Sequence, residues 1–323
     1  MPDRIDEGRA VDVLAEIFET LHVQSADVAR LELPTASAAE IGANSAVVVG
    51  IVLQGRLVVD VRGDRIAVSE GDVFCLPKGD AHVLGTDGFG RVEPATCFEI
   101  PVARLSERPR DAMTCVLRAN CSIVDPDKNP LLGVLPQVIH VSVGQRSNVQ
   151  WVQPIVEFLV REASSQKPGA ACVVNRLMEL LVLQLVRTHI ATSPVASHGW
   201  LRALSDAQIG GALGLIHDRP ADSFTVAGLA HAVGMSRSAF ASQFTRLVGE
   251  PPLHYVARWR MLKAAQLLKD NKQTLAEIAA TVGYESEAAF SKAFKRWSGR
   301  APGCYRRDRR NSEVPSSPQA LAG

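Results

Sequence analysis

One segment of the chain occurs twice near its C-terminal end, and the two copies match position by position. Residues 225–255 form the first copy, and residues 274–305 form the second with one extra residue. Each copy opens with a threonine that can cap a helix, places a glycine where the chain must turn, and then spaces phenylalanines one helical turn apart. The pattern predicts two helix-turn-helix units, over residues 225–248 and 274–298. A purely structural solenoid is disfavoured because solenoids need at least three stacked units.

The second helix of each copy has an inward and an outward face. The inward positions are Phe240, Phe244 and Leu247 in the first copy, and Phe290, Phe294 and Trp297 in the second. The opposite side of each helix is therefore free to meet a partner. Its residues, flanks included, are Arg237, Ser238, Ala241, Ser242, Gln243, Thr245 and Arg246, followed by Glu287, Ala288, Ser291, Lys292, Lys295 and Arg296 in the second copy. We expect Gly283 to hold its turn without touching any neighbour.

These two copies and the segment between them resemble the DNA-binding domain of the AraC/XylS family of bacterial transcription regulators. The resemblance covers residues 200–307. Between the copies, PPLHYVARWRMLKAAQLLKD is similar to the family's linking helix, and GYESEAAFSKAFKRWSGRAPGCYR is similar to its most diagnostic stretch. The resemblance implies double-stranded promoter DNA and RNA polymerase as partners. It also implies that base-facing positions are occupied by Ser238, Ala241, Ser242, Ala288 and Lys292.

Charge is divided unevenly along the chain. Residues 200–310 hold 17 Lys and Arg against 9 Asp and Glu, a net +8, whereas residues 1–199 hold 18 against 24, a net −6. Phosphate binding needs such a basic excess, because protein cations release the counterions condensed on DNA. A fragment starting near Trp200 is therefore expected to bind DNA alone. For four arginines a solvated basic tail is an equal alternative; they are Arg306, Arg307, Arg309 and Arg310.

The N-terminal part has a different pattern. Over residues 45–84, β-branched runs are broken by glycine turns, which is typical of an antiparallel barrel or jelly roll. Gly71, Pro77 and His82 have the spacing of the second cupin motif. GDVFCLPKGDAHVL and PLLGVLPQVIHV resemble the cupin-like sensory domain of one branch of AraC-type regulators, over roughly residues 10–190. The predicted fold class is α+β: an N-terminal antiparallel β-barrel with flanking helices, then an all-α domain of two helix-turn-helix units joined by a linking helix.

Metal chemistry is not expected in this barrel. Metal-binding cupins carry two histidines and a glutamate on an earlier strand pair, but SAVVVGIVLQGRLVVD contains no histidine, cysteine or glutamate. A lone His82 cannot hold a catalytic metal, and His140 is likewise expected to be structural. We therefore predict no catalytic residue, no metal and no cofactor. The rival interpretations are a metal-dependent cupin enzyme with a DNA-binding appendage, and a nucleoid-type binder, which the modest charge disfavours.

Cysteine usage gives no disulfide framework and no zinc pair. Four cysteines in the predicted sensor are candidates for redox sensing, with buried structural thiols as the commoner alternative. Together with the two histidines they form the candidate site for a small-molecule or redox effector: Cys75, His82, Cys97, Cys115, Cys121 and His140. The N-terminus lacks a signal-peptide pattern and no apolar run is long enough to span a membrane, so we expect a cytoplasmic protein without a membrane partner.

Residues 168–190 are apolar on more than one face. This predicts a helix that packs on the barrel and contacts a second subunit in a homodimer, with simple core burial as the alternative. The predicted organisation is a sensory and dimerisation domain, a linker, a DNA-binding domain and a disordered tail. Their limits are 1–190, 191–199, 200–307 and 308–323.

Overall fold

The computed structural model describes residues 13–87, 90–100, 104, 107, 110, 112–123, 126–142, 151–165, 167–192, 199–270 and 273–312. These residues belong to two compact units. One lies within Leu21–Ala196, and the other combines Met1–Thr20 with Ser197–Gly323. Most of the predicted linker, residues 193–198, lies outside the described residues.

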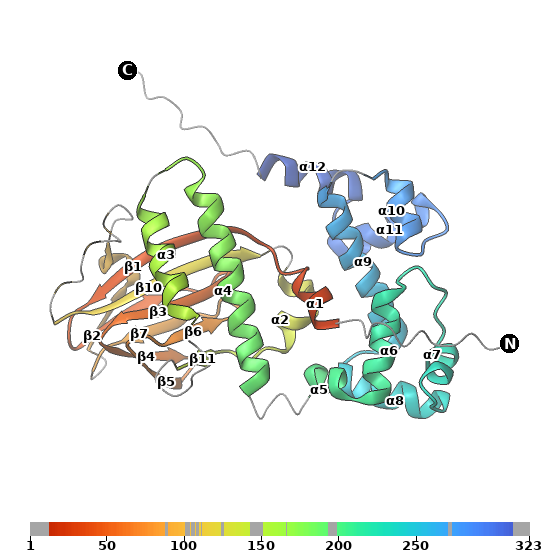
Figure 1. Ribbon diagram of the computed structural model, residues 1–323, viewed down its shortest axis with the longest axis horizontal. Helices are drawn as coiled ribbons and strands as arrows, with labels where there is room; N and C mark the ends of the chain where they lie inside the picture. Colours follow the sequence, from red (N-terminus) through yellow and green to blue (C-terminus); the bar gives the residue numbers. More distant parts are fainter. Residues whose placement is uncertain are drawn as a thin grey trace, which may run out of the picture. The chain divides into compact units, whose positions relative to one another are not determined.

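The first unit is built from two β-sheets (Figure 1). Its strands in the six-stranded sheet follow the order β11-β6-β3-β10-β1-β9, and those of the five-stranded sheet follow β5-β4-β7-β2-β8. The bounds are β1 Val23–Leu33, β2 Ser37–Ile41, β3 Val47–Gln54, β4 Arg56–Val61, β5 Asp64–Ser69, β6 Val73–Leu76, β7 His82–Gly85, β8 Arg91–Pro94, β9 Glu99–Ile100, β10 Thr114–Ile123 and β11 Ile139–Val141. The predicted antiparallel β domain is confirmed, with one difference: β2 and β8 are parallel, and the strands form two sheets.

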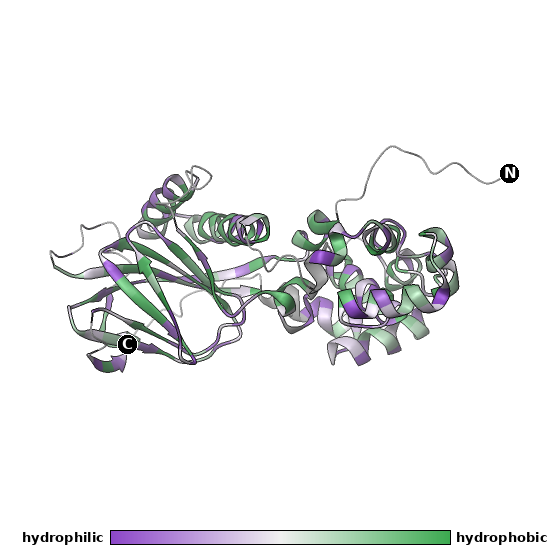
Figure 2. Cartoon of the chain, turned by 90° about the horizontal axis from the view of Figure 1, so that it is seen from below, coloured by the Kyte–Doolittle hydropathy of each residue, from purple (hydrophilic) through white to green (hydrophobic). Residues whose placement is uncertain are grey.

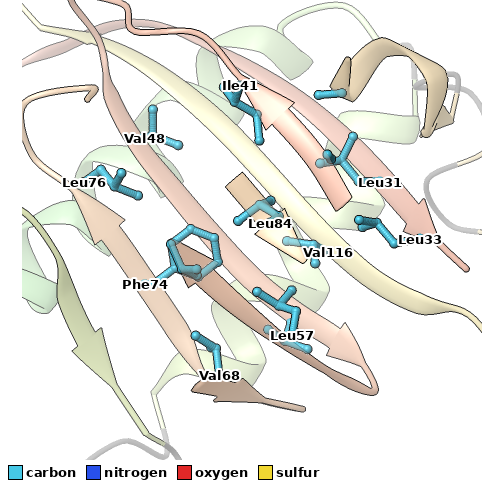
Figure 3. Close-up of a cluster of buried hydrophobic side chains, with 14 of the residues drawn as sticks. Leu31, Leu33, Ile41, Val48, Leu57, Val68, Phe74, Leu76, Leu84 and Val116 are labelled. Carbon is cyan, nitrogen blue, oxygen red and sulfur yellow. The ribbon is translucent and has the colours of Figure 1, made fainter. Parts of the chain in front are cut away.

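The core of this unit lies between the two sheets. Alternate residues of the strands supply it, among them Leu31, Phe74, Leu84 and Val116, which are all fully buried (Figure 3). Strand β3 is apolar along almost its whole length because both of its faces are covered. Figure 2 shows the resulting concentration of hydrophobic residues along the strands.

Helices cover the outer face of the six-stranded sheet (Figure 1). Helix α4 (Ala170–Thr192) contacts β1 and β11, and α3 (Val152–Ser164) packs against α4. The stripe of α4 that is buried comprises Val174, Met178, Leu181, Val182, Leu185 and Val186. A short helix, α2 (Pro130–Val134), is capped by Asn129, whose side-chain oxygen accepts the Leu131 N–H at 2.9 Å.

The second unit is helical, as predicted. Its helices are α1 Val13–Phe18, α5 Gly199–Ser205, α6 Ala207–Asp218, α7 Val226–Ala232, α8 Arg237–Val248, α9 Pro252–Asp270, α10 Leu275–Thr281, α11 Glu287–Ser298 and α12 Pro302–Ser312. Helix α9 joins the α7–α8 pair to the α10–α11 pair (Figure 1). Because α12 continues to Ser312, the prediction of a disordered tail from residue 308 is wrong for residues 308–312, and residues 313–323 lie outside the described chain.

Helix α1 belongs to this helical unit although it precedes β1 in the chain. It contacts α6, and Ile17 is fully buried. Glu16 forms an ion pair with Lys263 of α9. The sequence placed these residues with the sensor, and the difference arises because the buried face of α1 is covered by helices that follow much later in the chain.

Candidate DNA-binding surface and sensor interior

Each helix of the repeated pairs begins at a side-chain cap. Thr225 Oγ1 accepts the Gly228 N–H at 2.9 Å at the start of α7, and Ser236 Oγ accepts the Ala239 N–H at 3.3 Å at the start of α8. In the second pair, Thr274 and Glu277 form the predicted reciprocal capping box. Such caps satisfy N–H groups that a helix cannot satisfy internally, so both pairs have well-defined ends.

Tight left-handed turns separate the helices within each pair. Gly234 has φ +69° and Gly283 has φ +77°, a conformation that costs little only for glycine. The two turns differ in their surroundings. A Cβ atom at position 234 would meet nothing within 4 Å, whereas one at position 283 would lie 2.8 Å from the Ala221 Cα atom and 2.9 Å from Arg260 Nη2. The expectation that Gly283 touches no neighbour is therefore wrong, because the loop before α7 packs on it.

The two recognition helices bury equivalent aromatic rings. Phe240 and Phe244 have ring centroids 5.5 Å apart, and Phe290 and Phe294 have centroids 5.6 Å apart; all four are fully buried. In the second copy Phe294 also meets Tyr305 edge-on at 5.2 Å. Trp297, predicted to be buried, is only half-buried against this core. The inward phenylalanines fix how α8 and α11 are rotated and therefore which side chains point outward.

The opposite faces of α8 and α11 are exposed. The exposed residues are Arg237, Ser238, Ser242, Thr245, Arg246, Glu287, Ala288, Lys292, Lys295 and Arg296, while Ala241, Gln243 and Ser291 are half-buried. Gln243 Nε2 donates to Asp206 Oδ2 at 2.9 Å, and the same carboxylate caps α6. The Gln243 amide is thus engaged within the protein. This contact was not foreseen because Asp206 lies outside the repeat.

Among the described residues of the helical unit, the ion pairs join Arg219 to Asp218, Arg258 and His254 to Glu250, and Lys263 to Glu16, and none of these pairs uses a basic group on the exposed faces of α8 or α11. Cations on the exposed faces of α8 and α11 can therefore be directed at phosphates or bases.

Arg260 of α9 connects the two helix pairs. Its Nε donates to the Pro220 carbonyl at 2.7 Å and its Nη2 to the Asp222 carbonyl at 2.8 Å, both just before the first pair. Nη1 donates to the Gly283 carbonyl at 3.3 Å, in the turn of the second pair. The Arg260 guanidinium is half-buried, and burial lowers its pKa. Its three hydrogen bonds connect the first helix pair to the second and fix the spacing between the two pairs.

A buried histidine lies beneath the first pair. His217 stacks on Trp259 with centroids 3.7 Å apart, and its Nε2 is 2.8 Å from the Tyr255 hydroxyl. Burial, followed by the charge of Lys263, lowers the pKa of His217 to about 3, so the imidazole is neutral at physiological pH. His217 could not be predicted from the sequence, since an isolated histidine in an apolar helix belongs to no motif.

The candidate effector residues of the sensor lie in different places. Cys75, Cys115 and Cys121 are buried and alternate with the core residues of their strands, so they point away from the core between the sheets. Burial raises the pKa of Cys115 and of Cys121 to about 12 and also raises the pKa of Cys75, so these thiols stay protonated. Cys97 is exposed. Of the four, only Cys97 has the accessibility that redox sensing requires.

The two candidate histidines have separate partners. His82 Nδ1 is 2.9 Å from the Asp80 carbonyl oxygen, and burial lowers the pKa of this imidazole. His140 Nε2 is 3.1 Å from Asp72 Oδ2, a carboxylate that also accepts the Ser69 N–H. Over the described parts of the chain, no three His, Cys, Asp or Glu side chains gather into a set of metal ligands. The residues present therefore do not fit the metal site known from other cupins. No helix among the described residues has the length and apolarity needed to cross a bilayer.

Comparison with known proteins connects these two units to named families. Residues 12–191 match the Cupin family, and residues 229–308 match a Helix-turn-helix domain family. A putative AraC-like transcription regulator of Streptomyces antibioticus is 33% identical over 270 residues, covering 79% of this chain and 85% of that protein. The HTH-type transcriptional regulator AlkR of Acinetobacter baylyi is 31% identical over 307 residues, which cover 92% of this chain and 99% of AlkR.

Among solved structures, the DNA-binding domain of AdpA in complex with a target DNA is 28% identical, with a TM-score of 0.32. The alignment covers 34% of this chain and 99% of the AdpA chain. One sequence family matches the cupin unit and the other matches the larger part of the helical unit, and the alignment with AlkR extends across both. The resemblance drawn from the repeat and from the cupin motif is confirmed. The chain belongs to the AraC/XylS family of DNA-binding transcription regulators, and combines an N-terminal cupin domain with a C-terminal helix-turn-helix domain.

Proposed function

We propose that α8 and α11 are two recognition helices that enter successive major grooves on one face of promoter DNA. The observation that carries this proposal is the equivalence of the two pairs: the same caps, the same glycine turn and the same pair of buried phenylalanines leave the same face of each helix exposed. Two such helices joined by a rigid α9 suit sites about one turn of DNA apart.

The exposed residues divide by their position on each helix. Lys292 lies at the centre of the α11 face, where a side chain reaches base edges, whereas Lys295 and Arg296 lie nearer the flank and suit phosphates. On α8 the central residues are small, so contacts there rest on thymine methyl groups and on Arg246. The Gln243 side chain can contact a base only if its hydrogen bond to Asp206 breaks.

A binding-site selection with the full-length protein tests this division. Lys292→Ala should change which bases are selected and weaken binding by about 1–3 kcal/mol. Lys295→Ala should weaken binding to all sequences alike and flatten its dependence on salt. Arg187→Ala is the charge-matched control, because Arg187 is exposed on α4 of the other unit. Unchanged affinity and unchanged base preference in a folded Lys292→Ala protein would refute the assignment.

We further propose that the cupin unit senses an effector and that its occupancy changes promoter binding, directly or through recruitment of RNA polymerase. Support comes from the similarity to named transcription regulators, which extends across the cupin unit and the helical unit, and from the absence, among the described residues, of a metal-ligand cluster. A regulator of this kind acts in the cytoplasm and needs no catalytic residue. Recovery of stoichiometric iron, manganese or zinc that is lost on His82→Ala would instead support a cupin enzyme.

Homodimerisation through the helices of the sensor is part of this proposal. Two large apolar side chains there are exposed: Phe158 of α3 (47%) and Leu180 of α4 (43%). A second copy that covered them would remove this apolar surface from water. Leu180→Lys should then shift the protein toward the monomer in sedimentation velocity, with Gln153→Lys on the exposed side of α3 as the control. An unchanged sedimentation coefficient in both proteins would exclude this face as the dimer contact.

A further inference from the structure

Three polar side chains project into the apolar interior of the cupin unit. His82 precedes the core residue Leu84 by two positions in β7, and Arg118 and Asn120 follow the core residue Val116 by two and four positions in β10. Since strand residues two apart share a face, all three point between the sheets, into the region that Figure 3 shows around Leu84 and Val116. The ladders agree, because His82 lies opposite the core residue Ile41 and Asn120 lies opposite the core residue Val48.

One atom of each side chain is buried without a partner in the part of the chain that the structure describes: His82 Nε2, Arg118 Nε and Asn120 Oδ1. His82 is 3% exposed and Arg118 is 8% exposed. Their other polar atoms are engaged, since His82 Nδ1 meets the Asp80 carbonyl and Arg118 Nη2 donates to Glu99 at 3.0 Å. Buried polar atoms that make no hydrogen bond are costly and rare, and three in one interior indicate a missing polar partner.

The hydrogen-bonding character of these atoms selects the chemistry of that partner. Because His82 Nδ1 faces a carbonyl oxygen it carries the proton, which leaves Nε2 as an acceptor. The imidazole is neutral, since burial lowers its pKa and the charge of Arg118 lowers it further. Arg118 Nε–H is a donor and Asn120 Oδ1 is an acceptor. A carboxylate, which only accepts, would face two other acceptors, whereas a hydroxyl group can accept from Arg118 and donate to His82 or Asn120.

The surrounding side chains define the rest of the ligand. The interior beside the three polar residues is lined by Leu31, Phe74, Leu84 and Val116, all apolar. Phe74 lies over Gly50, which is opposite Arg118 in the ladder, and a Cβ atom at position 50 would be 2.0 Å from the ring. A glycine at this position therefore gives the Phe74 ring its place beside Arg118. A ligand bound here would contact this ring.

We propose that the cupin interior binds a neutral, apolar alcohol or phenol, whose hydroxyl oxygen accepts from Arg118 Nε and whose proton is donated to His82 Nε2 or Asn120 Oδ1. The proposal rests on the sensor function proposed above and names the chemical class of its effector. Turning the Asn120 amide by 180° would place a donor there, which a hydroxyl oxygen also satisfies.

Three small molecules that share the ethylbenzene skeleton test which ligand chemistry the interior of the full-length protein binds. They are 4-ethylphenol, with a hydroxyl group, 4-ethylbenzoate, with a carboxylate, and ethylbenzene, with neither. In calorimetric titrations the phenol should bind most tightly. His82→Leu and Arg118→Met should each weaken its binding about tenfold or more, as expected for the loss of one buried hydrogen bond. Cys121→Ala is the matched control, because Cys121 follows Asn120 on the same strand but points to the opposite face, and the dissociation constant should not change.

Three outcomes of the binding measurements overturn the proposal. Tighter binding of the benzoate would show a cationic site, and equal binding of ethylbenzene would show a purely apolar one. If no probe binds, and His82→Leu raises the melting temperature, the polar atoms hold buried water only. Promoter binding is measured separately in the same samples. A phenol that binds through these residues without altering promoter affinity would leave this site intact and refute the sensor function instead.

Discussion

Replacing the glycine in each turn by alanine should have unequal effects on the two helix pairs. Gly234 and Gly283 have nearly the same left-handed backbone, φ +69° and +77°, so the conformational cost of a Cβ atom is shared. That cost is about 1–2 kcal/mol. At position 234 nothing else lies within 4 Å. Gly234→Ala should therefore lower the free energy of unfolding by this amount alone.

At position 283 the new Cβ atom also meets packed neighbours. It would lie 2.8 Å from the Ala221 Cα and carbonyl oxygen atoms, which are backbone and cannot rotate away. Overpacking of this kind costs about 1–3 kcal/mol more. Gly283→Ala should then destabilise the helical unit by about 2–5 kcal/mol, roughly twice the effect at position 234.

Urea denaturation followed by tryptophan fluorescence measures this difference, because Trp259 and Trp297 lie in the helical unit. Promoter affinity should fall more for Gly283→Ala as well, since the carbonyl of Gly283 accepts from Arg260 and displacement of the turn moves α11 relative to α8. Equal destabilisation by the two substitutions would refute the contribution of packing at Gly283, and a larger loss at Gly234 would contradict the geometry of both turns.

Two further substitutions test the interior and the caps of the same unit. The pKa of His217 is about 3 in the folded protein and near 6.5 when unfolded, so the unfolded chain binds the proton first. The free energy of unfolding is therefore at its full value above about pH 6.5. It falls by up to about 1.4 kcal/mol per pH unit as the pH decreases from there toward about 3. His217→Phe should flatten this acid limb in urea titrations at several pH values, and an unchanged slope would contradict a neutral buried imidazole. Thr274→Ala removes the capping box and should cost about 1 kcal/mol, whereas Thr281→Ala, on an exposed residue at the end of the same helix, should cost less; equal losses would argue against the cap.

The helical unit was predictable because its determinants are local. Capping threonines, glycine turns and phenylalanines one turn apart act within a few residues, and the repeat doubles each signal. What the sequence missed depends on contacts across the unit. Gly283 is packed by Ala221, and Gln243 is held by Asp206, and neither partner stands at a fixed spacing from the motif.

The sensor was less predictable for a related reason. Glycine turns and alternating β-branched runs indicate strands, but they do not specify which strands pair, so the parallel pairing of β2 with β8 could not be derived. The cupin spacing drew attention to His82, but Arg118 and Asn120, which face the same interior, come from β10, which lies in the other sheet and carries no motif. Charged and amide residues in a buried strand could have served as a signal, since such residues are rarely buried without a partner.

Because helix α1 belongs to the helical unit, the chain must form this unit from two segments that are far apart in sequence. In sequence, the cupin domain is an insertion between the first helix of the helical unit and its remaining helices. The ion pair of Glu16 with Lys263 therefore closes a loop that contains the entire sensor. During synthesis, α1 leaves the ribosome before its packing partners α6 and α9, which are synthesised only after the whole cupin domain. A contact of such long range is slow to form in an unfolded chain, but it forms sooner once the inserted domain has folded and shortened the effective loop.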